Sequence, residues 1–63
     1  MRKHLTPMEL NILQLVIQGY TNKQIANTMG RSIKTIKNHI TTIYQKYGVS
    51  RRNDLKKFFD KSN

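Results

Sequence analysis

The chain has 63 residues and no cysteine, and its 12 lysine and arginine residues against three aspartate and glutamate residues give a formal net charge of +9. A chain of this length forms one domain, over 1–63, that buries only about 60 % of the surface of its unfolded form, so its stability has to come from well-packed local elements such as helices. The composition excludes a disulfide framework, a cysteine-containing zinc site and a membrane-spanning run of about 18 apolar residues.

The first predicted helix covers 7–18. Thr6 offers a capping hydroxyl, Pro7 suits the first helical position, and Glu9 stands three residues after the cap. Apolar residues then recur at helical spacing, and Gly19 can adopt the left-handed conformation that ends a helix. These signals predict a helix that starts sharply.

The second predicted helix covers 22–29 and starts in the same way. Thr21 is the capping residue, Gln24 is the amide three positions later, and Gly30 follows the last helical residue. Only a short glycine-containing turn separates this helix from each of its neighbours. Two short helices joined in this way are typical of a helix-turn-helix.

The third predicted helix, over 33–47, has the clearest pattern. Its apolar residues form one stripe at steps of three and four: Ile33, Ile36, Ile40, Ile43 and Tyr47. The face away from the stripe contains no acid and consists of Lys34, Asn38, Thr41 and Gln45, with Lys37 on its flank. Such a face favours insertion into the major groove of DNA, where lysine and asparagine donate to purine edges and threonine meets a thymine methyl. An ordinary solvated face is the alternative, although such faces usually mix both signs of charge.

The fourth predicted helix, over 51–60, has two arginines in its first turn. Cations there oppose the helix dipole by up to about 1 kcal/mol each, so a bound DNA phosphate would relieve the conflict at Arg51 and Arg52. Pairing with Asp54 or Asp60 is the alternative.

Two adjacent phenylalanines close the same helix. Because Phe58 and Phe59 point 100° apart, one is expected to seal the core and the other to lie in an exposed apolar patch. A second copy of the chain would cover that patch most simply. The predicted dimer interface is therefore on this helix and consists of Leu55, Phe58 and Phe59.

The positive charge is concentrated in the second half of the chain. Residues 1–30 contain three basic residues and one acid, whereas residues 31–63 contain nine basic residues and two acids. A one-sided positive field attracts polyanions, and nucleic acid is the commonest of them. A basic protein that is merely soluble is the alternative, but this excess is larger than solubility requires.

From Leu5 to Leu55 the sequence resembles the LuxR-type (GerE-like) DNA-binding domain. The matching residues are Leu5-Thr6, Glu9, Ile12-Leu13, the run from Gly19 to Ala26, Ser32, Thr35-Ile36-Lys37, His39, Ile43, Lys46, Val49 and Arg52. The resemblance implies an all-α, four-helix fold whose second helix crosses the DNA backbone, whose third helix enters the major groove, and which dimerises through the fourth.

The same resemblance implies roles for individual residues. Base-edge contacts are expected from Lys37, Asn38 and Thr41, to which the helical wheel adds Lys34. Phosphate contacts are expected from Thr21, Lys23, Thr35, Lys46 and Arg52, and the argument from the helix dipole adds Arg51.

The chain also departs from the family pattern. Met8 and Asn11 stand where the family usually has a charged pair that ties the first helix to its neighbours. We therefore expect this helix to be held mainly by apolar contacts.

Catalysis is not expected. The three acids are widely separated, no glycine-rich phosphate loop is present, and neither histidine has a cysteine or carboxylate nearby in the sequence. We also expect no metal and no cofactor. The charged N-terminus leads to no hydrophobic signal core, which predicts a cytoplasmic protein.

The sequence thus predicts a transcriptional regulator that binds a specific double-stranded DNA sequence as a homodimer and has no membrane partner. RNA polymerase is a further candidate partner. Two alternatives have the same charge: a non-specific nucleic-acid-binding or RNA-binding module, and a cationic membrane-active peptide. The first lacks an exposed aromatic platform, and the second does not need two capped short helices.

Overall fold

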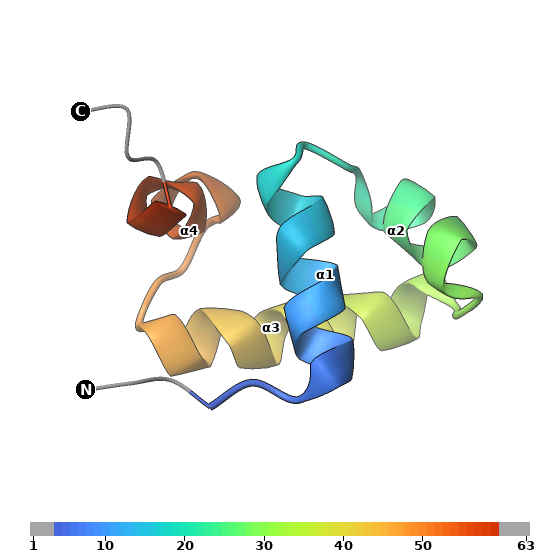
Figure 1. Cartoon of the computed structure of the whole chain (residues 1–63), viewed down its shortest axis with the longest axis horizontal. Coiled ribbons are helices and arrows are strands. Elements are labelled where there is room, and N and C mark those ends of the chain that lie inside the picture. The colour runs from blue at the N-terminus through green and yellow to red at the C-terminus, as the bar shows by residue number, and fades with distance from the viewer. Residues whose placement is uncertain (1–3, 60–63) are drawn as a thin grey trace.

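The computed structural model describes residues 4–59, which form four helices: α1 (Pro7–Ile17), α2 (Asn22–Met29), α3 (Ile33–Tyr47) and α4 (Arg52–Phe59) (Figure 1). The predicted bounds of the second and third helices are confirmed. The first helix ends one residue earlier than predicted and the fourth begins one residue later; the predicted end at residue 60 lies outside the described residues. The all-α prediction is confirmed.

Local hydrogen bonds define where the helices begin. At α1, the Thr6 hydroxyl accepts from the Glu9 amide at 3.1 Å, and the Glu9 carboxylate accepts from the Thr6 amide at 3.1 Å. Thr21 and Gln24 make the same reciprocal pair at the start of α2, at 3.1 and 2.9 Å. Ser32 caps α3. Because each bond spans three residues, these helix starts depend on local sequence alone.

Two of the turns depend on glycine. α2 ends at Gly30 and α3 ends at Gly48, with φ values of +69° and +68°. Residues with a Cβ atom rarely adopt this left-handed conformation. These glycines therefore let the chain leave α2 and α3 abruptly and keep the domain small.

One hydrophobic core joins all four helices. α1 lies across α3, with α2 beside the N-terminal end of α3 and α4 near its C-terminal end (Figure 1). Each helix contributes at least one buried apolar side chain, and α3 contributes a row of three isoleucines. The buried core consists of Ile12, Leu13, Val16, Ile25, Ala26, Ile36, Ile40, Ile43 and Leu55.

An ion pair also fastens α1 to α3. The Lys46 ammonium donates to Oε1 of Glu9 at 2.7 Å and to the backbone carbonyl of His4 at 2.8 Å. Glu9 is only 6 % exposed. Apolar contacts were expected to be the main link between α1 and its neighbours. The ion pair between Glu9 and Lys46 is a further link, and it takes the place of the charged pair that is missing at Met8 and Asn11.

The environment of Glu9 favours its ionised form. The hydrogen bond from Lys46 is the largest effect that lowers the pKa of Glu9, and the hydrogen bond from the Thr6 amide lowers this pKa further. Burial acts in the opposite direction and is outweighed. The carboxylate thus caps α1 and binds Lys46 at the same time.

A change of Glu9 to Gln should reveal this contribution as a pH-dependent loss of stability. A lowered folded-state pKa stabilises the fold above the unfolded-state pKa, and the effect disappears as the pH falls through the folded-state pKa. We expect Glu9→Gln to lower the free energy of unfolding at pH 7 by about 1 kcal/mol. Urea unfolding at several pH values should show the difference shrink below pH 4.5, the ordinary pKa; a difference independent of pH would contradict this account.

Candidate nucleic-acid interface

The outer face of α3 is polar, exposed and free of acid. Its basic, amide and hydroxyl side chains are all solvent-exposed: Lys34, Lys37, Asn38 and Thr41. The opposite side of the helix is buried in the core through its isoleucines. The prediction that these four residues share the exposed face of a well-anchored helix is confirmed, whereas their contacts with DNA bases stay a prediction.

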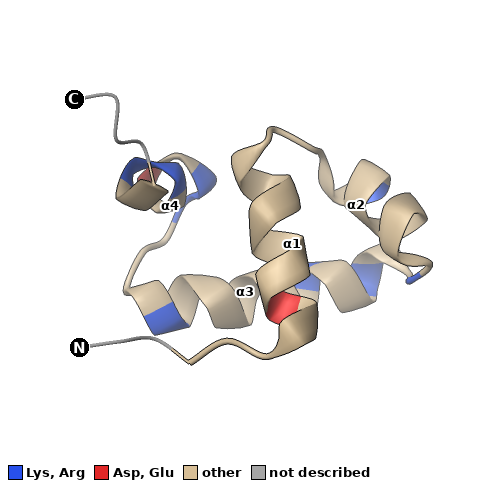
Figure 2. Ribbon diagram, in the orientation of Figure 1, with Lys and Arg blue, Asp and Glu red and all other residues tan. Residues whose placement is uncertain are grey.

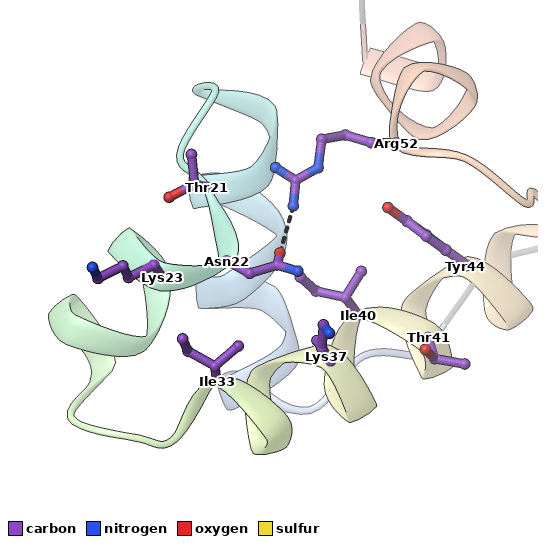
Figure 3. Close-up of a pocket in the computed structure, with 9 residues that line it drawn as sticks. All are labelled: Thr21, Asn22, Lys23, Ile33, Lys37, Ile40, Thr41, Tyr44 and Arg52. Atoms are coloured by element: carbon purple, nitrogen blue, oxygen red, sulfur yellow. Dashed lines mark hydrogen bonds between the residues drawn. The ribbon is translucent and has the colours of Figure 1, made fainter.

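A shallow groove of about 710 Å³ lies beside this face, between α2, α3 and the start of α4 (Figure 3). α3 forms one wall, and the first turn of α2 with Thr21, the residue that caps it, forms the other. The residues that line the groove are Thr21, Asn22, Lys23, Ile33, Lys37, Ile40, Thr41, Tyr44 and Arg52. Predicted base-contacting and phosphate-contacting residues therefore meet in one concave surface.

Two threonines predicted to contact phosphates make hydrogen bonds at helix starts: Thr21 caps α2, and Thr35 binds Ser32, the cap of α3. The Thr21 hydroxyl accepts from the Gln24 amide, and the Thr35 hydroxyl accepts from the Ser32 hydroxyl at 3.0 Å. A hydroxyl that accepts a bond still has its own proton to donate. Both threonines therefore keep a donor for an external oxygen while they stabilise the helix starts.

Lys23 and Arg51 are exposed. The structure thus leaves the charges of these two predicted phosphate contacts in solvent. Figure 2 shows the described acidic residues on α1 and α4 and none on α2 or α3. No acid from the described part of the chain therefore stands on the two helices that form the walls of the groove.

Two other predicted phosphate contacts have partners inside the fold. Lys46 binds Glu9 and the carbonyl of His4. Arg52 donates from Nη1 to the carbonyl of Tyr20 at 2.6 Å and from Nη2 to Oδ1 of Asn22 at 2.8 Å. Arg52 therefore reaches neutral oxygens, and the hydrogen bonds from its guanidinium link α4 to the α1–α2 turn.

The prediction for the fourth helix needs correction at Leu55. Its side chain is 0 % exposed and belongs to the core of its own chain, so it is not available for a dimer interface. Phe58 and Phe59 are 51 % and 37 % exposed, so the prediction that one of them seals the core is wrong. Leu55 does so instead, because it faces α1 and α3 while the phenylalanines follow it at the end of the helix.

Both phenylalanine rings lie against Tyr47. The ring centroids of Phe58 and Phe59 are 5.3 and 5.6 Å from the centroid of Tyr47. The three side chains form one surface, which we call the aromatic patch, at the junction of α3 and α4. The aromatic patch contains the predicted interface phenylalanines without Leu55.

Four groove residues were not predicted to be functional: Asn22, Ile33, Ile40 and Tyr44. Ile33 was placed in the buried stripe, but it is 42 % exposed because it lies in the first turn of α3, at the rim of the core. Tyr44 lies seven residues, or about two helical turns, after Lys37, so a position beside the groove could have been inferred from the helical periodicity. Asn22 had no such signal, because its partner Arg52 is 30 residues away.

Two classes of feature are not found among residues 4–59. No helix in this range combines the length and apolar character that a bilayer span requires. In the same range, no three metal-ligating side chains come together in a group that could hold an ion.

Comparison with protein-family models identifies a relationship over nearly the whole chain. Residues 3–59 match the family described as "GerE: Bacterial regulatory proteins, luxR family". The matched range includes all four helices and every residue that lines the groove. This is a family of helix-turn-helix DNA-binding domains and not of enzymes.

Truncation of Leu55 and of Phe58 should separate the core from the aromatic patch. Leu55→Ala leaves a cavity in a fully buried site and should lower the free energy of unfolding by about 2 to 5 kcal/mol. Phe58→Ala removes a half-exposed ring and its contact with Tyr47, at a cost of about 1 kcal/mol. Urea unfolding followed by circular dichroism measures both changes, and equal losses would argue against a core position for Leu55.

Proposed function

Because the chain belongs to the LuxR family of bacterial regulatory proteins and is a helix-turn-helix DNA-binding domain of a transcriptional regulator, we propose that it recognises a specific duplex sequence with α3 in the major groove. One observation carries this proposal: the acid-free face of α3 is exposed beside a groove whose other wall is the start of α2. A helix fits the width of the major groove, and its N-terminal half reaches the base edges.

In this proposal, the exposed side chains of α3 contact the base edges. Lys37 lines the groove and, with Lys34, can donate to the O6 and N7 atoms of guanine. Asn38 can bind adenine at N6 and N7, and the Thr41 methyl can meet a thymine methyl. The buried isoleucines behind these residues hold α3 rigid, so the donors keep one spacing relative to the bases.

In this proposal, residues around the groove contact the DNA backbone. Lys23 and Arg51 have exposed charges, and Thr21 and Thr35 keep hydroxyl donors. The first amides of α2 add donors, because they have no partner within the helix. Lys46 and Arg52 are left out of this set, since two donors of each side chain already bind oxygens of the chain.

Selection of bound sequences from random duplex DNA should yield one preferred site, and two lysine variants should then behave differently on it. Lys37→Ala should weaken binding to that site by about 1 to 3 kcal/mol and relax one base position. Lys23→Ala should weaken binding to all duplexes alike and reduce the salt slope by about 1.

Lys57→Ala provides the charge-matched control, because Lys57 is exposed in the last turn of α4 and does not line the groove. Equal losses for Lys37→Ala on selected and random DNA would contradict base reading. Tighter binding to structured RNA than to the selected duplex would favour the non-specific nucleic-acid-binding alternative instead.

The proposal extends to a homodimer on DNA, joined through the aromatic patch. Phe58 and Phe59 expose apolar surface at the end of a cationic helix, and such a surface favours contact with a partner. A two-fold axis through the patch would bury both phenylalanines against their copies and place two α3 helices on successive half-sites. Bound in this way, the domain would act on RNA polymerase from its DNA site.

Charge introduced into the aromatic patch should abolish cooperativity without unfolding the domain. Phe58→Glu and Phe59→Glu should each convert cooperative binding to a two-half-site duplex into independent binding, while affinity for one half-site changes little. Leu10→Glu is the matched control, because Leu10 is 46 % exposed on α1, away from the patch. Retention of cooperativity in both phenylalanine variants would exclude α4 as the interface.

A further inference from the structure

We propose that Arg52 is a positioning residue for DNA binding: it holds the first turn of α2 in place and so determines where Thr21 and Lys23 meet the DNA backbone. This inference rests on the proposed function for its consequence, although the tether itself is a property of the free protein. It gives Arg52 a role different from the direct phosphate contact that the sequence predicted.

The hydrogen bonds of Arg52 enclose the cap of α2 from both sides. Nη1 donates to the carbonyl of Tyr20 at 2.6 Å. Nη2 donates to the side-chain oxygen of Asn22 at 2.8 Å, the bond that is dashed in Figure 3. These acceptors are the residues directly before and after Thr21, the N-cap of α2. One guanidinium therefore restrains the chain entering α2 and the first residue of the helix together.

Other contacts restrain the same turn less directly. The backbones of α2 and α4 do not pack against each other, so the Arg52 side chain spans the distance between them. The bonds between Thr21 and Gln24 are local and set the shape of the first turn but not its position in the domain. Among the hydrogen bonds of the described residues, those of Arg52 connect this turn to a distant helix.

Two hydrogen bonds to neighbouring acceptors, such as these, require a guanidinium group. Its planar fork presents two parallel donors to two acceptors, which an ammonium group cannot do with the same geometry. Both acceptors are neutral oxygens, so they hold Arg52 without cancelling its charge. The cation remains beside the groove and adds to its attraction for a polyanion even though its donors bind the protein.

Arg52 also determines which way the Asn22 amide faces. A guanidinium can only donate, so it has to bind the oxygen of the amide and not the nitrogen. Figure 3 shows the Asn22 nitrogen turned from Arg52 toward α3, within the groove. The tether thus leaves the two N–H donors of Asn22 on the side where DNA is proposed to lie.

Salt titrations of DNA binding by Arg52→Lys and Arg52→Met test the proposal. Since lysine keeps the charge but loses the fork, both variants should bind the selected duplex about tenfold more weakly, as expected for the loss of a hydrogen bond to a charged group. The salt slope of Arg52→Lys should equal that of the parent protein. Asn22→Ala should cause a similar loss, and its combination with Arg52→Met should be no worse than Arg52→Met alone.

A second measurement needs no DNA. Amide hydrogen exchange in the free protein should become faster at Gln24 and Ile25, whose amides in the first turn of α2 are hydrogen-bonded to Thr21, in both Arg52 variants, and remain unchanged in the middle of α3. Ile43→Val controls for general destabilisation, because Ile43 is fully buried in the core and away from the groove. This variant should lose stability without a loss of DNA affinity once the protein is folded.

The outcomes separate the inference from the proposed function. Full affinity in Arg52→Lys together with a salt slope reduced by about 1 in Arg52→Met would identify a direct phosphate contact and overturn the positioning role. Unchanged exchange in the first turn of α2 would overturn it as well. If exchange rises as expected but the parent protein binds no duplex better than random DNA, the tether stands and the proposed function fails.

Discussion

The burial of the α3 isoleucines is the interaction on which the remaining structure depends. Ile36, Ile40 and Ile43 turn one side of the longest helix into the centre of the core, and every other helix packs around it. A domain this small has little other apolar surface to bury. The same burial forces the opposite side of α3 into solvent, so stability and the exposure of the residues proposed to contact DNA have one cause.

Hydrogen bonds from two cations, Lys46 and Arg52, add to the core in holding the helices together. Lys46 joins the end of α3 to the start of α1, and Arg52 joins the start of α4 to the start of α2. In each case a cation reaches from one element to a helix start that a local capping box has already shaped. The chain thus uses two of its many positive charges to fix its own geometry and leaves others in solvent for a polyanion.

The groove brings together residues that have separate positions in the sequence. Its two walls come from α2 and α3, and its edge toward α4 contains Arg52 (Figure 3). A phosphate contact on α2 and a base contact on α3 have to keep a constant separation if one DNA register is to be preferred. The proposed role of Arg52 adds α4 to this arrangement, and α4 also contributes to the aromatic patch proposed for the dimer.

The sequence by itself determined the features that depend on residues within about one turn of each other. The caps at Thr6 and Thr21, the helix bounds and the acid-free side of α3 all follow from spacings of three or four residues, which the helical backbone converts directly into position. A family resemblance added the residues expected to contact DNA, and the three that it places at base edges, Lys37, Asn38 and Thr41, are exposed on α3.

Only the tertiary structure decided what the long side chains of the second half bind. Lys46 and Glu9 are 37 residues apart, and Arg52 lies 30 and 32 residues from its two acceptors. No periodicity spans such separations, so a lysine predicted to meet DNA cannot be told in the sequence from one that binds a buried glutamate. Leu55 was assigned to the wrong surface for the same reason: the helical pattern shows that a side chain is apolar, but the packing of the other helices determines whether it closes the core or faces a partner.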